Sequence, residues 1–256
     1  MASSSLLRLS AVLALSALFY GCSTYHPPGP RADLEALTPL SMREAFTVQP
    51  TNPFPASVAV VRVQGASYSN HYLNRHGGMF NTGRHTVILT KEVGEDIHLE
   101  KLRGLPQLAG VVSLNRMLLP ERIDSDREIR EAAARLQADM VLLYTFDTAF
   151  FGSDASVPLS VITLGLSPTR RISVTTTASA LLLDTRTGFI YAAYEVTERA
   201  NTLATSWGSR ESADQIRQET ESNAFAKLAD IFVADWPTLL DRYRPHPAGA
   251  DGLSVR

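Results

Sequence analysis

The sequence contains only one cysteine, Cys22, and therefore excludes an intramolecular disulfide. A surplus of charge of one sign is also lacking, because 24 basic and 26 acidic side chains leave a formal net charge of −2. A nucleic-acid-binding protein needs a basic face, and charge-driven adsorption to anionic lipid needs a polybasic segment. The sequence therefore predicts neither kind of binding.

The motifs of common catalytic and cofactor sites are missing as well. No G-x-x-x-x-G-K-S/T run is present that would bind a nucleotide, and no G-x-S-x-G turn that would expose a nucleophilic serine. His71, His76 and His85 lie near tyrosines and asparagines, but no Asp, Glu or Cys lies among them and their spacing fits no zinc motif. We expect a solvated loop here, with metal binding by these histidines as the alternative. We expect no catalytic residue and no cofactor.

What the sequence does contain is an apolar leader that ends at the cysteine. Arg8 precedes the apolar run Leu9–Tyr20, which is shorter than the roughly 20 residues of a membrane-spanning helix. Gly21 and Cys22 follow at once. The segment Leu18–Cys22 resembles the bacterial lipobox, in which a small residue precedes a cysteine that becomes lipidated.

The lipobox resemblance implies that residues 1–21 are a lipoprotein signal peptide and that Cys22 is the lipidated first residue of the mature chain. Several fatty chains on its thiol and amine would hold the protein stably on a membrane, where a single chain is marginal. Ser23 follows the cysteine, and by resemblance to Gram-negative lipoproteins this implies sorting to the outer membrane. We therefore expect an outer-membrane protein whose lipid anchor faces the periplasm, with exposure at the cell surface as the alternative.

Proline and glycine residues divide the rest of the chain. Residues 23–36 contain three prolines and a glycine, which predicts a flexible tether. Ser41 and Glu44 form a capping-box pattern that predicts a short helix over Met42–Phe46. The expected units are 22–54 (lipidated cysteine, tether and short helix), 55–241 (a single α/β domain) and 242–256 (a flexible tail).

Hydrophobic patterns within the main unit alternate between strand and helix. The runs Val58–Val63 and Met140–Phe146 are typical of strands buried on both faces. Ser125 and Glu128 form a second capping box, which opens a helix with apolar residues three and four positions apart. The other expected elements are Gly65–Arg84 (loop or irregular hairpin), His85–Thr90 (strand), Glu95–Arg103 (helix) and Ala109–Leu119 (strand and its exit). This order predicts an α/β (α+β) fold with a mixed sheet packed by helices.

A long β-hairpin and a long helix follow. Apolar and hydroxyl side chains alternate over Ile172–Leu182, and every second residue of Ile190–Val196 belongs to one apolar face. Gly188 suits a left-handed position in the turn between them. A final helix is expected over Glu211–Trp236, with Pro237 ending it.

Two short segments carry a family resemblance. Ala138–Tyr144 and Ala180–Gly188, together with the order of elements from Val58 onward, are similar to the periplasmic α/β domain of curli-secretion-channel-type lipoproteins and to the amino-terminal domain of the Tol-system β-propeller protein. The resemblance implies a mixed sheet packed by helices behind a lipidated amino terminus. It implies no channel, because the insertion Phe150–Arg171 could form only one short membrane hairpin and contains two prolines.

The leading hypothesis is a non-enzymatic envelope lipoprotein that is attached to the membrane through Cys22 and binds another envelope protein. Two alternatives stay open. In the first, the chain forms a homo-oligomeric secretion or pore assembly with Phe150–Arg171 as its membrane element. In the second, it is an envelope hydrolase or metal binder that uses the loop with His71, His76 and His85.

Overall fold

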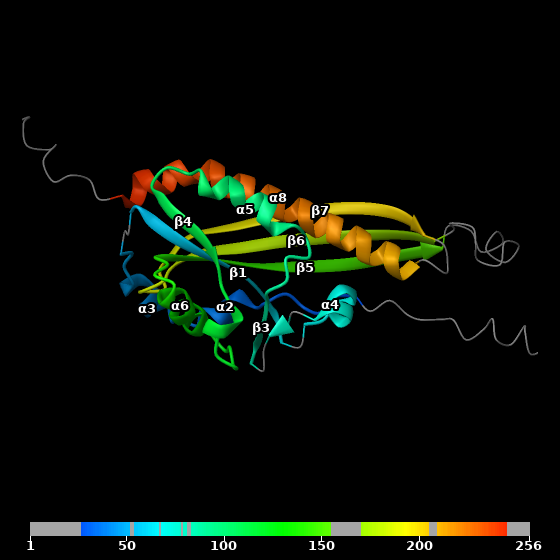
Figure 1. The fold of residues 1–256 in the computed structure, drawn as a ribbon, viewed down its shortest axis with the longest axis horizontal. Helices are drawn as coiled ribbons and strands as arrows, with labels where there is room; N and C mark the ends of the chain where they lie inside the picture. Colours follow the sequence, from blue (N-terminus) through cyan, green and yellow to red (C-terminus); the bar gives the residue numbers. More distant parts are fainter. Residues whose placement is uncertain are drawn as a thin grey trace, which may run out of the picture.

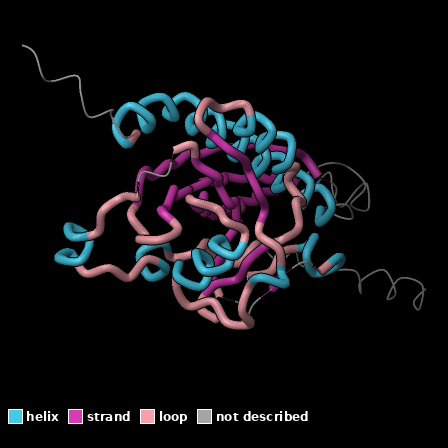
Figure 2. Tube along the Cα trace, turned by 60° about the vertical axis from the view of Figure 1, so that its left-hand side comes forward, coloured by secondary structure: helices cyan, strands magenta, loops and turns pink. Residues whose placement is uncertain are grey.

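The computed structural model describes residues 27–51, 54–66, 68–77, 79–80, 83–154, 170–204 and 209–244. Cys22 with its leader and residues 155–169 of the insertion lie outside the described residues. The described chain forms one mixed sheet with helices on both faces (Figures 1 and 2), which confirms the predicted α/β fold class.

The centre of the sheet is the predicted strand with the β-branched run, β1. It pairs in parallel with β5 on one edge, while β3 (antiparallel) and β4 (parallel) share its other edge. Apolar side chains leave both faces of β1 and are almost fully buried, as the continuous pattern predicts. The strands are β1 (Ala56–Gly65), β2 (Met79–Phe80), β3 (His85–Ile88), β4 (Leu108–Ser113), β5 (Met140–Asp154), β6 (Arg170–Asp184) and β7 (Ile190–Ala204).

Three long antiparallel strands, β5, β6 and β7, extend the sheet well beyond β1 (Figure 1). Each contains 15 residues, so the predicted end of β5 at Phe146 is too early and the predicted start of β6 at Ile172 is too late. The missed part of β5 begins at Asp147, where the strand becomes exposed on one face and its apolar run stops. Residues at both ends of the predicted insertion therefore belong to the sheet.

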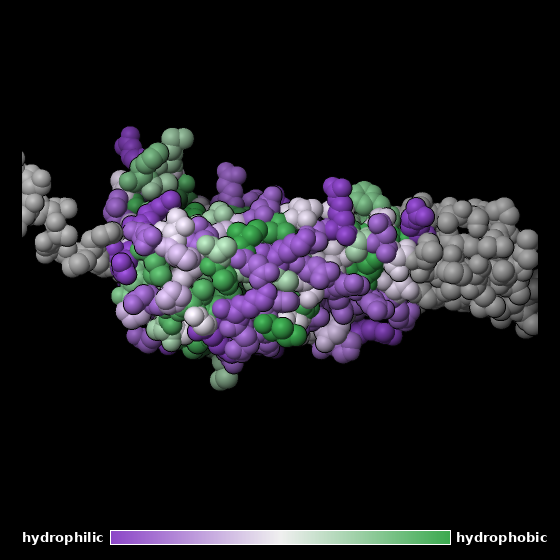
Figure 3. Space-filling view, turned by 90° about the horizontal axis from the view of Figure 1, so that it is seen from above, coloured by the Kyte–Doolittle hydropathy of each residue, from purple (hydrophilic) through white to green (hydrophobic). Residues whose placement is uncertain are grey.

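One face of the sheet is covered by two helices, α5 (Glu95–Arg103) and α8 (Ser209–Tyr243) (Figure 1). The predicted alternation in β6 is confirmed: Ala178, Ala180 and Leu182 pack with apolar residues of α8 in the larger core. The outer surface of these helices is mostly hydrophilic with scattered apolar patches (Figure 3). This face of the sheet therefore has a complete hydrophobic core under a solvated layer.

The opposite face is covered by shorter helices, of which α6 (Asp126–Arg135) contributes most to a second core. Both predicted capping boxes form, at Ser41 and at Ser125. The other helices of this part are α2 (Leu34–Leu37), α3 (Met42–Thr47) and the 3-10 turn η2 (Arg116–Leu118). The strand expected over Ala109–Leu119 therefore ends at Ser113.

Helix α8 continues past the proline that was expected to end it. Pro237 lies inside the helix, and Trp236, Leu239 and Leu240 around it are buried. Proline costs a helix one backbone hydrogen bond, but burial of large apolar side chains on both sides of it offsets that loss. The indole of Trp236 also donates a hydrogen bond of 2.8 Å to the carbonyl oxygen of Pro106. The expected tail at residue 242 therefore begins too early, because the helix extends to Tyr243.

The turn between β6 and β7 corrects the predicted face of β7. The register shifts between Leu182 and Leu183, so that Tyr191 is the extra residue of a bulge. Tyr191 is buried and Ile190 is 41% exposed, which removes Ile190 from the predicted apolar face. Gly188 has the expected positive φ of 74°.

The first described residues pack on the body, which corrects the predicted tether for this part of the chain. Ala32 and Leu37 are fully buried, and the amide of Ala32 donates a hydrogen bond of 2.9 Å to Thr145 Oγ1. Arg31 forms an isolated antiparallel bridge with Gln64. Proline-rich composition alone does not keep a chain solvated when apolar residues follow closely.

The segment Gly65–Arg84, expected as a loop or an irregular hairpin, contains helix α4 (His71–His76) and strand β2, which pairs with β3 in a short antiparallel hairpin. Asn70 caps α4 by accepting a hydrogen bond of 2.7 Å from the amide of Leu73, and Leu73 is buried. A helix this short gives no clear periodic pattern, which is why the sequence did not indicate it.

Candidate functional site

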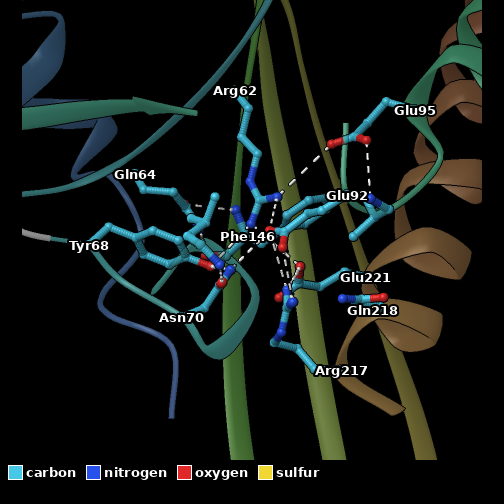
Figure 4. Close-up of polar contacts among 12 residues, drawn as sticks. Arg62, Gln64, Tyr68, Asn70, Glu92, Glu95, Phe146, Arg217, Gln218 and Glu221 are labelled. Atoms are coloured by element: carbon cyan, nitrogen blue, oxygen red, sulfur yellow. Dashed lines mark hydrogen bonds and ion pairs between the residues drawn. The ribbon is translucent and has the colours of Figure 1, made fainter. Parts of the chain in front are cut away.

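A buried arginine lies in the middle of the apolar strand β1. The side chain of Arg62 is 1% exposed, and its guanidinium lies over the ring of Phe146 at 4.6 Å from the centroid. Its Nη2 donates a hydrogen bond of 3.1 Å to the hydroxyl of Tyr68. A buried guanidinium requires charged partners, and three acidic side chains surround this one (Figure 4).

A second buried arginine reaches the same place from helix α8. The side chain of Arg217 is fully buried and contacts three carboxylates. Its Nη1 donates to Glu221 Oε2 at 2.7 Å, one helical turn away, and its Nε donates to Asp214 Oδ1 at 3.0 Å. We define the buried ion network as Arg62, Glu92, Glu95, Asp214, Arg217 and Glu221.

Glu92, in the loop between β3 and α5, joins the two arginines. Its Oε1 accepts hydrogen bonds of 2.9 Å from Arg62 Nη1 and from Asn70 Nδ2, and its Oε2 accepts one of 3.0 Å from Arg217 Nη2. Burial raises the pKa of the Glu92 carboxyl, but the attraction of Arg62 and Arg217 outweighs burial and lowers the pKa overall. Glu92 is therefore the ionised centre of the network.

Glu95 and Glu221 occupy the network's two sides. Burial raises the pKa of each carboxyl, and the neighbouring arginines offset only part of that increase. Tyr144 donates a hydrogen bond of 3.2 Å to Glu95, and Thr148 donates one of 3.0 Å to Glu221. With two guanidinium groups facing four acidic side chains, partial protonation of these two carboxyls would bring the network closer to neutrality.

The network connects three parts of the fold. Arg62 belongs to β1, Glu92 and Glu95 to the segment before and at the start of α5, and the other three residues to α8. The ion pairs fix the position of the amino-terminal half of α8 over the sheet, where apolar packing is supplied by the small cluster of Ile172, Val174, Ala213 and Ile216. The network thus orients a helix that hydrophobic contact alone holds less specifically.

The cavity beside the network is too small for a substrate. It measures about 30 Å³ and is lined by residues that include Arg62, Glu95 and Tyr144. Such a volume accommodates a water molecule or two, whereas ligand pockets measure roughly 300–1,000 Å³. The described contacts of the two guanidinium groups are with carboxylates and other groups of the chain itself, so this arrangement joins elements of the fold.

The structure separates the predicted histidines. His71 and His76 lie at the two ends of α4, where the ring of His76 stacks on Tyr72 with centroids 4.3 Å apart. His85 lies in β3 and is buried, and burial lowers the pKa of its imidazole. Within the part of the chain that the structure describes, no group of three or more His, Cys, Asp or Glu side chains could hold a metal ion. The metal alternative therefore has no assembled site in these residues.

The buried ion network was not predicted from the sequence. One signal was present, since Arg62 interrupts an apolar β-branched run and Arg217 and Glu221 lie four positions apart in a helix. Their partners, however, come from positions 125 and 159 residues distant. Cys22, the one site that the sequence did predict, lies outside the described residues.

Comparisons with known proteins add little to the geometry. No protein-family model and no curated protein matches the sequence. Among the described helices, none is both long and apolar enough to cross a membrane.

Several solved structures are similar to this chain at low sequence identity and low TM-score. A Xanthomonas campestris protein of the DUF330 family is 14% identical over 84% of this chain and 98% of its own, with a TM-score of 0.35. A minor lipoprotein of Acinetobacter baumannii is 10% identical over 75% of this chain and 97% of its own, with a TM-score of 0.31. Lipoprotein GNA1162 of Neisseria meningitidis is 14% identical over 66% and 99%, with a TM-score of 0.28. Two of these three proteins are bacterial lipoproteins by name, and similarities this low establish no family and no function for the present chain.

Proposed function

We propose that the protein is a lipoprotein of the bacterial outer membrane, lipidated at Cys22, whose folded body binds another envelope protein and catalyses no reaction. The lipobox segment supports the anchor, and the resemblance of Ala138–Tyr144 and Ala180–Gly188 to anchored periplasmic α/β domains supports the arrangement. The described part of the body has one sheet with helices on both faces, and the buried ion network joins β1, the start of α5 and α8.

Strand β7 is the observation that supports protein binding. It pairs with β6 along one edge, and among the described strands none pairs with its other edge. An edge of 15 residues presents backbone amide and carbonyl groups that can accept a strand of a partner. Natural proteins usually shorten or cover such an edge, so an edge of this length indicates binding to a partner protein.

The sheet face beside this edge is polar and well ordered by cross-strand contacts. The hydroxyls of Thr177 and Thr197 lie 2.8 Å apart, and Ser173 Oγ donates a hydrogen bond of 2.5 Å to Asn201 Oδ1. The side chains of Thr197, Arg199 and Asn201 are exposed. Short hydroxyl and amide side chains on a rigid sheet suit a polar protein interface that buries little apolar surface.

Photo-crosslinking in the intact envelope tests this proposal. A photoreactive amino acid at Thr197 is expected to give one adduct of defined size, whereas the same residue at the exposed Glu131 of α6 gives none. Arg199→Glu should abolish the adduct, because it reverses a charge on the same strand, and Arg127→Glu on α6 should leave it unchanged. An adduct that is equally strong from position 131, or that Arg199→Glu does not reduce, contradicts binding at β7.

A further inference from the structure

We infer that helix α4 and the segment Pro27–Arg31 form the face of the protein that lies against the lipid headgroups of the membrane. This inference rests on the proposed lipidation of Cys22 and adds an orientation to it. Its evidence is the length of chain between the anchor and the body, the contacts that fasten the first described residues, and the charge of the surrounding surface.

The chain between the anchor and the body is short. Four residues separate Cys22 from Pro27, the first described residue. The five steps from Cys22 to Pro27 span at most about 18 Å, whatever their conformation, because one extended residue advances at most about 3.6 Å. A lipid at Cys22 therefore keeps Pro27 within roughly that distance of the headgroups.

The residues after Pro27 are fastened to the segment that leads into α4. The amide of Gly29 donates a hydrogen bond of 3.0 Å to the carbonyl oxygen of Ser69, and the amide of Gly65 donates one of 2.9 Å to that of Pro30. A Cβ atom on Gly29 would lie 2.9 Å from Tyr68 Cα, so the two backbones are in close contact. The anchor point and α4 consequently cannot separate without breaking these contacts, and Figure 1 shows the first described residues beside α4.

Helix α4 itself carries no acidic side chain, and the exposed Asp147 nearby is paired with Arg31 at 3.8 Å. No Asp or Glu occurs from Gly65 to Lys91, a stretch that contains Arg75 and Arg84. Arg75 and His76 are exposed in the last turn of α4, and Tyr72 stacks on His76. Tyrosine and arginine suit the membrane–water interface, because each combines an apolar body with a polar end. Helix α4 therefore adds no negative charge that phosphate groups would repel. The short covalent link, and not charge, holds this face near the membrane.

Energy transfer to labelled lipid tests the orientation. The lipidated protein is placed in vesicles of phosphatidylethanolamine and phosphatidylglycerol that carry an acceptor dye on a headgroup. A donor dye is attached to a genetically encoded azide residue at Asn74 of α4 or, as the matched control, at Ile97 of α5; both side chains are exposed. In Figure 1, α4 lies below strand β5, whereas α5 lies above it beside α8. We expect transfer from position 74 to exceed transfer from position 97 several-fold.

A second sample distinguishes failure of the orientation from failure of the anchor. The unlipidated mature chain is coupled through Cys22, its only cysteine, to a maleimide-bearing lipid in the same vesicles. Higher transfer from position 74 in this sample supports the orientation even if the native chain proves not to carry lipid. Equal transfer from both positions, or higher transfer from position 97, overturns the orientation even if lipid is found at Cys22. In 1 M salt, where screening acts over about 3 Å, the difference is expected to persist.

Discussion

Glu92 and Arg217 are 125 residues apart in the sequence, yet Glu92 Oε2 accepts a hydrogen bond of 3.0 Å from Arg217 Nη2 and both side chains are completely buried. This pair connects the loop before α5 to helix α8, and Arg62 of β1 shares the same carboxylate. A buried ion pair is weak evidence for net stability, but removing one partner leaves an unpaired charge in the interior. The buried ion network is therefore the part of the body that is most sensitive to single substitutions.

Replacing Glu92 by Gln tests that sensitivity. The substitution keeps the shape of the side chain and removes its charge, so two buried guanidinium groups lose one of the two carboxylates that they share. We expect the free energy of unfolding to fall by about 3–5 kcal/mol, measured by urea denaturation. The exposed ion pair of Lys101 and Asp230 provides the control, and Asp230→Asn should cost less than about 1 kcal/mol. A Glu92→Gln loss as small as that of the control would contradict the importance of the network.

Arg217 and Glu221 are expected to be energetically coupled. Each of Arg217→Met and Glu221→Leu leaves an excess of one charge in the buried ion network. The double variant removes one charge of each sign and replaces them by apolar volume. The double variant should therefore lose less stability than the sum of the single losses, by at least about 1 kcal/mol in a double-mutant cycle. Additive losses would show that the contact of 2.7 Å between Arg217 Nη1 and Glu221 Oε2 carries no coupling.

Glu95 and Glu92 should affect the pH dependence of stability in opposite directions. Burial raises the pKa of Glu95 above its value of about 4.5 in the unfolded chain. Its contribution to stability is therefore complete below pH 4.5 and is lost as the pH rises through the raised folded pKa. Glu95→Gln mimics the protonated form, and we expect it to gain stability relative to the natural protein as the pH increases above 4.5.

The attraction of two arginines lowers the pKa of Glu92 by more than burial raises it. The contribution of Glu92 to stability is therefore present above about pH 4.5 and is lost as the pH falls through the lowered folded pKa. The deficit of Glu92→Gln should accordingly shrink in acid. Urea unfolding from pH 8 down through the lowered folded pKa of Glu92 measures both trends. A parallel pH dependence in the two variants would refute the assignment.

Asp184 organises the turn between β6 and β7. Its Oδ2 accepts hydrogen bonds of 2.8 Å from the amide of Thr51 and from the hydroxyl of Tyr191, and its Oδ1 accepts bonds from the amides of Arg186 and Thr187. Burial raises the pKa of Asp184, but these hydrogen bonds outweigh it and lower the pKa.

In Asp184→Asn, an NH2 group replaces one carboxylate oxygen and cannot accept the hydrogen bonds that this oxygen accepted. We therefore expect the free energy of unfolding to fall by roughly 2–3 kcal/mol at neutral pH. Because the folded pKa of Asp184 is lowered, its contribution is present above the unfolded value of about 3.8 and is lost as the pH falls through the folded pKa. The deficit of the variant should therefore diminish in acid. Asp241→Asn, at an exposed position in α8, is the matched control and should change stability by less than about 0.5 kcal/mol. A loss at Asp184 that does not depend on pH would argue against an ionised carboxylate in the turn.

The sequence predicted those features that depend on local pattern. The β-branched run of β1, the capping boxes at Ser41 and Ser125 and the alternation in β6 all lead to the structure that forms, because each pattern depends on residues close together in the chain. Pro237 misled the prediction, since tertiary burial of Trp236 and its neighbours overrides a local helix breaker.

Features that depend on distant contacts escaped prediction. The bulge at Tyr191 moves Ile190 out of the apolar face, and the packing of residues 27–37 is set by β1 and β5. Arg62 indicated a buried charge by its place in an apolar strand, but the identity of its partners depends on how α8 crosses the sheet. A single sequence shows that a charged residue lies in an apolar strand, but it does not show which distant residues pair with that charge.

The intact mass of the mature protein from native membranes tests the central proposal, attachment through Cys22, most directly. We expect the mass of a chain that begins at Cys22, increased by a diacylglyceryl group and an amide-linked fatty acid, and we expect Cys22→Ser to lack both additions. A mature chain that begins at another residue, or one that begins at Cys22 without lipid, would contradict the proposal.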